Sequence, residues 1–419
     1  MLKQLTCAAA CLVFSSLRLS GQEAVSGISL PITISGDARY TNGDSAEAGE
    51  RAATGGFRAL VYPALKLGSH WFFYSAIEAH SSSYFSYEVG PYQERDVEAR
   101  VMQAYAGYAT RISRASLLIK AGQMSSAFGL FPLEYDDAKM PLIDPPASYA
   151  ANLPLRPDQR PCGVADILRQ EYGDEIDYRC GGSHTDRYGL VPVTLYGLPA
   201  IETDLSIARL DARFQVTNSS PANPQALTSG SQFAQWTAGG GYTLPGGLHL
   251  GVSGFGGPYL DRALAPYLPE VRGIRSFRAS GAGLDAEWAR GPWALEGEWQ
   301  RFRFDLPNFA ISPSEQIAYA QAKRILSPRV FVAMRAATLQ FGPVKDLRGV
   351  SANQFAGTQE VYEIGGGYRL NRMQLIKFEV NWTHGPAWSA GRRFWPSTDD
   401  CRLEAQLVTS VTAVSKAFR

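Results

Sequence analysis

Polar and apolar residues alternate along most of this chain, and the hairpin at 361–382 shows the alternation best. One face of its second arm carries large apolar residues, at Ile376, Phe378, Val380 and Trp382. The other face carries polar residues, at Lys377, Glu379 and Asn381. Successive side chains of a strand leave opposite faces, so this period of two predicts strands. A tight turn at Asn371–Arg372 joins the two arms.

The same alternation recurs along nearly the whole chain and predicts about sixteen strands. That number is large for a soluble sheet but normal for an outer-membrane barrel. Lipid covers the apolar face of such strands, and a watery lumen takes the polar face. We therefore predict an all-β fold, a closed transmembrane antiparallel up-and-down β-barrel of about 16–18 strands.

Short and long connections alternate between these strands. Short turns are expected at 68–70, 112–115, 202–204, 245–247, 290–292, 327–329 and 370–372. Longer polar connections are expected at 86–95, 124–189, 218–230, 258–275, 306–314, 342–358 and 385–400. Bacterial barrels have short periplasmic turns and long outer loops, whereas a β-sandwich has no reason to sort loop length in this way. The phase of one strand is irregular, because Gln103 falls on the side that Val97, Ala99 and Val101 make apolar.

Aromatic residues support the barrel. Four of them lie beside short turns, Trp71, Tyr242, Trp288 and Trp293. An interfacial girdle would place amphipathic rings there. The alternative is that they are core aromatics of a soluble sheet.

The connection at 124–189 follows the predicted fifth strand, 116–123, and is far longer than a structureless loop usually is in a compact domain. It contains several prolines and an acidic run between Cys162 and Cys180. Such length suggests a function of its own. Two hypotheses stay open: part of the loop bends into the lumen and narrows the channel, or the loop caps the outer mouth.

The N-terminus predicts a secretory signal peptide at 1–21, with Lys3 before an apolar stretch at 5–17 and cleavage near Gly21. A lipoprotein anchored at Cys11 is disfavoured, since little apolar sequence precedes that residue. The barrel then occupies 22–419. Cys7 and Cys11 would be lost with the signal peptide. Export permits a disulfide, and we expect Cys162 to pair with Cys180 and Cys401 to stay free.

Charge and composition exclude several classes of function. Forty basic and 39 acidic residues give a net charge of +1, so no overall field favours nucleic acid or an acidic partner. Beyond the N-terminus no apolar run is long enough for a membrane-spanning helix. That excludes a helical inner-membrane protein but not a barrel, whose strands are only half apolar.

Several segments resemble the phosphate-selective porins and their relatives. Residues 101–131, VMQAYAGYATRISRASLLIKAGQMSSAFGLF, are similar to the stretch where a strand, a turn and a second strand lead into a Gly-Gln-aromatic-x-x-x-Phe-Gly segment. Later hairpins look similar at 210–224, 238–260, 283–299 and 330–342. The resemblance implies a barrel of about sixteen or more strands, and commonly a trimer of barrels in the outer membrane.

The chain also departs from that family's pattern. Met124 stands where an aromatic residue is usual, and the sequence has no dense ladder of arginines or cluster of lysines. Barrels of this kind generally end on an aromatic residue that closes the last strand. Here that strand, at about 401–413, is followed by VSKAFR, with Phe418 next to last.

Charged side chains that face the lumen set which ions pass a pore. The polar phase of the strands gives basic pore-lining candidates at Arg58, Lys66, Arg100, Lys120, Arg213, Lys323, Arg335 and Lys377. Acidic candidates are Glu98, Asp285, Glu287, Glu296, Glu298 and Glu379. Four of these acids would share one wall, because Asp285 and Glu287 lie on one arm of a hairpin and Glu296 and Glu298 on the other. The alternative for each residue is simple solvation or pairing with a neighbour.

Catalysis is the competing class, and some outer-membrane barrels are hydrolases. Of the five histidines only His249 lies mid-strand on the polar phase, close to Ser253. Such a pair without a third orienting group is a weak signal. No His/Cys/Asp cluster has metal-ligand spacing. We therefore expect no enzyme, with no catalytic residues, no metal and no cofactor.

These observations predict an outer-membrane porin that forms a water-filled channel for passive diffusion of small hydrophilic solutes or ions. The mixed charges predict weak selectivity. The expected partners are outer-membrane lipid, the solutes and, from the resemblance, two further copies in a homotrimer. The alternatives are a structural or adhesive barrel plugged by the long loop and, with less support, an outer-membrane hydrolase.

Overall fold

The computed structural model describes residues 27–43, 53–81, 97–130, 135–150, 155–170, 180–181, 193, 197–223, 233–268, 272–388 and 394–415. The predicted signal peptide, with its cleavage position near Gly21 and with Cys7 and Cys11, lies outside these residues. So does much of the acidic run between Cys162 and Cys180.

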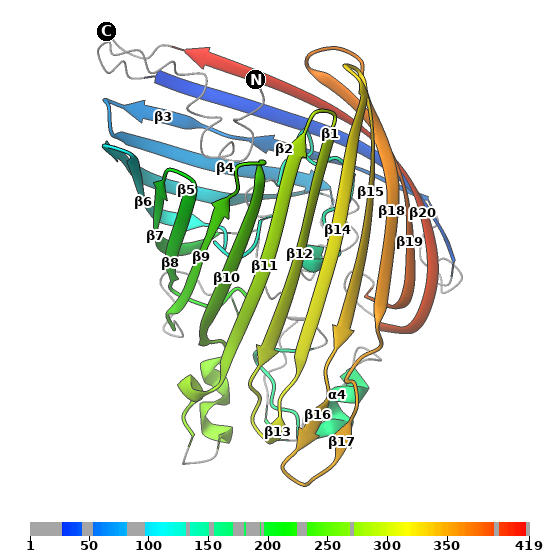
Figure 1. The fold of residues 1–419 in the computed structure, drawn as a ribbon. Coiled ribbons are helices and arrows are strands. Elements are labelled where there is room, and N and C mark those ends of the chain that lie inside the picture. Colours follow the sequence, from blue (N-terminus) through cyan, green and yellow to red (C-terminus); the bar gives the residue numbers. More distant parts are fainter. Residues whose placement is uncertain are drawn as a thin grey trace.

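Seventeen of the described strand segments form one closed antiparallel barrel (Figure 1). Its first half contains β1 (Gly27–Gly43), β2 (Ala53–Val61), β3 (Ala64–Leu67), β4 (Trp71–Ser81), β5 (Val97–Ile112), β6 (Ala115–Met124), β7 (Leu198–Ile207), β8 (Leu210–Thr217) and β9 (Gln235–Thr243). Its second half contains β10 (Leu248–Pro258), β11 (Arg278–Arg290), β12 (Trp293–Phe304), β14 (Ser314–Ser327), β15 (Val330–Phe341), β18 (Gln359–Arg369), β19 (Gln374–Trp388) and β20 (Phe394–Ser415). The sheet has 17 segments, and β2 and β3 form one strand, so 16 strands make the wall. The predicted barrel is confirmed.

The barrel closes between the first and last strands. β1 and β20 pair in continuous antiparallel register from Ile28 opposite Ser415 to Gly43 opposite Asp400. Among the described strands of the barrel, closure leaves none at an open edge of the sheet. The break between β2 and β3 falls at Tyr62 and Pro63, where proline has no N–H to donate to the ladder.

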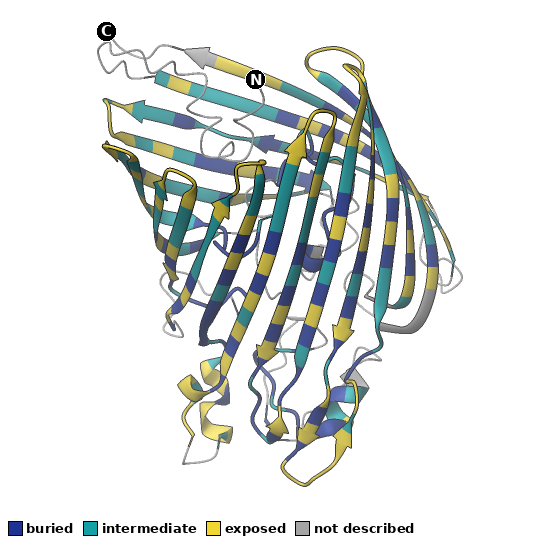
Figure 2. Cartoon of the chain, in the orientation of Figure 1, coloured by how far each residue is buried: buried dark blue, intermediate teal, exposed yellow. Residues whose placement is uncertain are grey.

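Buried and exposed positions alternate along the strands (Figure 2), and the two faces of the wall differ in polarity. On β19 the Phe378 side chain is 60% exposed on the outside, whereas Lys377 beside it is 0% exposed. On β15 Met334 is exposed and Arg335 is buried. The apolar phase therefore faces outward and the polar phase faces inward, the reverse of a soluble protein.

A β-bulge explains the irregular phase around Gln103. Ala76 on β4 lies opposite Gln103, but the next residue, Ile77, lies opposite Val101. The extra residue, Met102, is buried, and after it the Gln103 side chain turns inward to donate to Ser125 Oγ at 2.8 Å. One inserted residue shifts the alternation from one face to the other.

Tight turns lie at the upper end of the barrel in Figure 1, and the helices and short strands of the long connections lie at the lower end. The tight turns occupy 68–70, 113–114, 208–209, 244–247, 291–292, 328–329 and 370–373. The exposed side chains of Trp71, Tyr242 and Trp293 lie next to this end, and Trp288 near it is half-buried.

One predicted turn is wrong. Residues 202–204 lie within β7, and the turn is at Ala208–Arg209. Ala208 has a φ of 56°, as the first position of a two-residue hairpin turn requires, but alanine is not a typical turn residue. Glu202 and Asp204 suggested a turn because they are polar and close together. In β7 they occupy every second position and so lie on one face of the strand. The long connection before β7 accordingly runs from 125 to 197 rather than to 189.

The long connections build a second layer at the lower end. It contains a small sheet of β13 (Phe309–Ile311), β16 (Val344–Asp346) and β17 (Ser351–Ala352), with α4 (Val164–Gln170), η2 (Arg262–Tyr267) and η3 (Ile274–Ser276). The short α3 (Ala147–Ala150) lies beside β14 and β15. Among the described residues, no helix has the length and apolar character needed to cross a membrane.

An apolar cluster fills part of the barrel toward this lower end. Its buried aromatic members include Phe128, Phe255, Tyr259, Phe277, Phe302, Phe304, Phe309, Phe341 and Phe355. They come from inward positions near strand ends and from the connections. This cluster is the core of the molecule, and it lies inside the wall.

Candidate functional site

The connection after β6 enters the barrel at once and contacts the wall formed by β8, β10 and β12. The Arg213 guanidinium donates to the Gly129 carbonyl at 2.7 Å, and Gln215 Nε2 donates to the Ser125 carbonyl at 2.8 Å. The backbone N–H of Leu130 donates to Glu298 Oε1 at 2.6 Å. The first part of the loop is thus bound to inward-facing side chains.

The segment 135–146 contacts another part of the wall, around β2 and β19. Lys377 Nζ donates to the carbonyls of Asp137 and Leu142, both at 3.0 Å, and lies 3.4 Å from that of Met140. The ammonium group, with 0% of Lys377 exposed, is therefore enclosed by loop backbone. The segments 125–130 and 135–146 are both bound inside the barrel, so the first part of the loop folds into the lumen.

The other hypothesis, a cap, describes a later part of the same loop. Arg160 donates to the Asn308 side chain at 2.7 Å, and Asn308 Nδ2 donates to the Pro161 carbonyl at 2.9 Å. Cys162 and Cys180 form a disulfide there, and Cys401 is free. Residues 155–170 thus contact the connections at the lower end, while 125–130 and 135–150 lie within the barrel.

Arg58 on β2 is the centre of a first charged cluster. Its guanidinium contacts Glu78 at 2.5 Å and Asp137 of the loop at 2.9 Å. Arg100 contacts the other oxygen of Glu78 at 2.9 Å. Arg58 also lies 3.9 Å above the Tyr135 ring. Removing one partner of such a buried pair leaves an uncompensated charge, which is strongly destabilising.

Arg335 on β15 is the centre of a second cluster. It contacts Glu363 through Nε at 2.5 Å and through Nη2 at 2.6 Å. The same Nη2 donates to the carbonyls of Asp144 and Pro145 at 2.6 and 3.1 Å. One guanidinium therefore ties the barrel wall to the loop, with the planar fork geometry that arginine provides.

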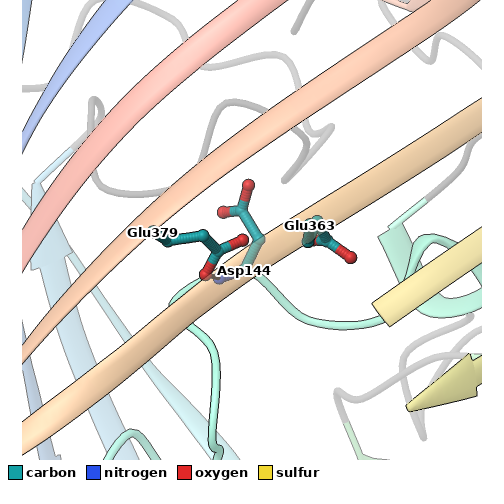
Figure 3. A group of neighbouring side chains, drawn as sticks. All are labelled: Asp144, Glu363 and Glu379. Carbon is teal, nitrogen blue, oxygen red and sulfur yellow. Dashed lines mark hydrogen bonds between the residues drawn. The ribbon is translucent and has the colours of Figure 1, made fainter. Parts of the chain in front are cut away.

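Three carboxylates gather beside Arg335 (Figure 3): Asp144 from the loop, Glu363 from β18 and Glu379 from β19. One oxygen of each lies within 4.8 Å of the others. The backbone N–H groups of Ile143 and Asp144 donate to Glu379, and Arg335 binds Glu363.

The Asp144 carboxylate of this trio lies 3.5 Å from both Arg39 and Arg402. Three oxygens are fewer than calcium takes, and the arginines already supply positive charge. We assign no metal to this group.

A third contact lies on the wall formed by β12. The Tyr149 hydroxyl donates to Glu298 at 2.7 Å, and Gln300 Nε2 donates to that hydroxyl at 2.8 Å. Phe128 packs nearby, with ring centroids 5.2 Å from Phe255 and 5.6 Å from Phe302.

Lys120 on β6 contacts Glu202 and Asp204, two acids that the sequence analysis assigned to a turn. Its ammonium group lies 2.9 Å from Asp204 and also contacts Glu202. Gln215 donates to Glu202 at 2.6 Å. The strand phase would have found both acids once the turn at 208–209 was recognised.

The remaining candidates lie on the inner phase of their strands. The register sets Asp285 opposite Glu298 and Glu287 opposite Glu296. Lys323 lies 4.6 Å above the Phe331 ring. Lys66 and Glu98 are half-buried.

Several inward charges were absent from the sequence-based set. They are Arg39, Glu78, Asp137, Asp144, Glu202, Asp204, Glu363, Arg402 and Glu404. The strand residues among them lie on the polar phase of their strands, and this phase could have identified them in the sequence. The loop acids follow no periodic pattern, so the sequence could not have identified them.

His249 and Ser253 have separate partners. His249 Nδ1 lies 3.2 Å from Thr243 Oγ1 and 3.8 Å from Asp211. Ser253 Oγ accepts the Gly129 N–H at 3.4 Å. Neither contact is the nucleophile–base geometry of a hydrolase.

Comparisons with solved structures place this architecture among bacterial outer-membrane proteins. The anion-selective porin from Comamonas acidovorans aligns over 92% of this chain and 100% of its own, with a TM-score of 0.54 and 8% identity. The chain shares its fold. The outer membrane channel DcaP of Acinetobacter baumannii aligns over 94% and 100%, with a TM-score of 0.52 and 10% identity.

OmpT, an outer membrane protein of Vibrio cholerae, aligns over 93% of this chain and 99% of its own, with a TM-score of 0.52 and 8% identity. No family model matches the sequence, and no curated protein matches it. Identities this low establish the shared fold alone.

Proposed function

We propose that the protein is an outer-membrane porin for passive diffusion of small hydrophilic solutes or ions. The observation that carries this proposal is the inverted wall. Large apolar side chains such as Phe378 and Met334 face outward around a closed barrel. A soluble monomer rarely exposes so much contiguous apolar surface, whereas lipid hydrocarbon suits it.

The part of the loop made of 125–130 and 135–150 is the proposed constriction. It is fixed to the wall by Arg58, Arg335 and Lys377 and by the acids Glu298 and Glu379. The sequence-based pore-lining set stays a proposal, with these five as loop anchors. Acids and bases are paired within the lumen, which supports weak selectivity.

The testing experiment is single-channel recording of the purified protein in a planar bilayer. Ion-sized conductance steps are expected, with a reversal potential near zero under a salt gradient. Silence would favour the second candidate, a plugged structural or adhesive barrel, which is supported by the aromatic cluster inside the wall. A strong anion or cation preference would contradict the proposed pairing of lumen charges.

The oligomer and the family are finer proposals. One solved structure with this fold is described as a trimer form of OmpT of Vibrio cholerae, and the resemblance to phosphate-selective porins points the same way. We propose a homotrimer, which mass measurement in detergent tests. Phosphate currents that exceed chloride currents would support membership of the phosphate-selective group.

A further inference from the structure

Three arginines lie on the outer face of β11 and β12 at the long-connection end of the barrel. Arg301 and Arg303 are exposed, while Phe302 and Phe304 between and after them are 0% exposed inside the wall. Arg278 is exposed on the matching phase of β11. We call Arg278, Arg301 and Arg303 the outer arginine patch.

The register brings these side chains together. Arg303 lies opposite Ser280, and Arg301 lies opposite Ala282. The backbone N–H of Asp305 donates to the Arg278 carbonyl at 2.9 Å, so Arg278 lies beside the same end of β12. Asp305 also pairs with Arg303 at 3.1 Å, at an exposed position. Three arginines and one aspartate leave two positive charges on this face.

The height of the patch follows from strand geometry. Trp293, exposed beside a tight turn, begins β12, and Arg301 and Arg303 follow eight and ten residues later. A rise of about 3.4 Å per residue on a strand tilted by about 40° gives about 21 and 26 Å. The apolar band of such barrels is about 25 Å tall. The two guanidinium groups therefore lie at the far rim of the band, level with lipid headgroups.

More arginines continue the patch toward the long connections. Arg272 and Arg275 are exposed just before β11, and Arg272 lies 4.4 Å above the Phe277 ring. Arg262 and Arg275 lie 4.8 and 5.5 Å from the Phe233 ring. Aromatic rings orient guanidinium groups without neutralising them.

We propose that the outer arginine patch binds the phosphate groups of membrane lipids in the leaflet at the long-connection end. Guanidinium forks match phosphate oxygens in two parallel hydrogen bonds, and the charge is complementary. The apolar band lies on one side of the patch and the exposed long connections lie on the other. The lipid headgroup layer therefore surrounds the patch. The inference rests on the proposed membrane location.

The test is native mass spectrometry of the full chain in detergent micelles. Wild type is expected to retain dioleoyl phosphatidic acid in preference to dioleoylglycerol, which has the same acyl chains and no phosphate. R301S/R303S should weaken phosphatidic acid binding by about 30-fold, if each arginine contributes as basic residues do near anionic lipid surfaces. R301K/R303K keeps the charge and should recover part of the binding.

R290S/R324S is the matched control. Arg290 and Arg324 are exposed on β11 and β14 at the tight-turn end, and their loss should leave binding within twofold of wild type, as surface charges far from a site usually do. Equal weakening in both variants, or no wild-type preference for the phosphate, would overturn the site. Complete displacement by equimolar inorganic phosphate would also overturn it, because the site would then bind free phosphate.

Conductance recorded on the same preparations separates this inference from the porin proposal. R301S/R303S should conduct like wild type, because both side chains lie outside the wall. A silent wild type that retained phosphatidic acid would contradict the porin and leave the lipid site standing.

Discussion

Two walls of the barrel hold the same loop by different chemistry. The wall formed by β2, β15, β18 and β19 uses buried charges, with Arg58, Arg335 and Lys377 bound to loop groups. The wall formed by β10 and β12 packs Phe128 of the loop against Phe255 and Phe302 and adds one carboxylate, Glu298, as a hydrogen-bond acceptor. Charge pairs fix one register and one partner each, whereas apolar packing tolerates small shifts. We infer that the charged wall sets the position of the loop and the aromatic wall adds affinity.

Arg335→Ala should give the largest effect, because it leaves Glu363 buried without its partner and releases two loop carbonyls. The free energy that holds the loop against the wall should fall by about 3–5 kcal/mol. Hydrogen exchange at the Ile143 and Asp144 amides measures it as faster loop opening, and conductance should rise. Met334→Ala, on the outer face of the same strand, is the control and should leave both unchanged.

Phe128→Ala should have the second-largest effect. It should weaken loop docking by about 3 kcal/mol, because it removes a buried ring and leaves a cavity. Exchange at 125–130 should speed up, while Ile143 stays protected if the two walls act independently. Equal loss of protection at both places would show that the loop opens as one unit, and the proposed division of roles would fail.

Tyr149→Phe removes only a hydroxyl that donates to Glu298. A hydrogen bond to a charged group typically contributes about 1.5–3 kcal/mol, so we expect about 2 kcal/mol of weaker docking. Unfolding in urea and exchange near α3 measure it. Tyr267→Phe, in the exposed η2 region, is the matched control, and a similar loss there would contradict the assignment.

The smallest effect is a pH dependence outside the membrane band. Burial acts to raise the pKa of Asp346, but backbone N–H groups of Val164, Val350 and Arg348 and the Arg348 guanidinium lower it overall. A lowered pKa means that the carboxylate stabilises the fold above its ordinary value of 3.8 and stops doing so as pH falls through the lowered value. Protease access to 162–166 should therefore rise in acid, and Asp346→Asn should remove that dependence.

The sequence predicted the barrel because alternation and loop length are local properties. Pairing is not local: Asp144 meets Arg402 although 258 residues separate them. The loop acids Asp137 and Asp144 bind the wall, but no periodic pattern in the sequence could have identified them. The bulge at Met102 and the alanine at the 208–209 turn misled for the same reason, since both depend on how neighbouring strands align.

The pairing of β1 with β20 has a consequence for biogenesis. Residues 28 and 415 are partners, so one edge of β1 stays without hydrogen-bond partners until β20 has been synthesised. Contacts so distant in sequence form slowly. An open sheet that lacks its last strand would expose unpaired edge strands, which can pair with other chains. The nascent polypeptide should need a holding factor until translation ends, and truncation after residue 400 should send it to aggregation rather than to a smaller barrel.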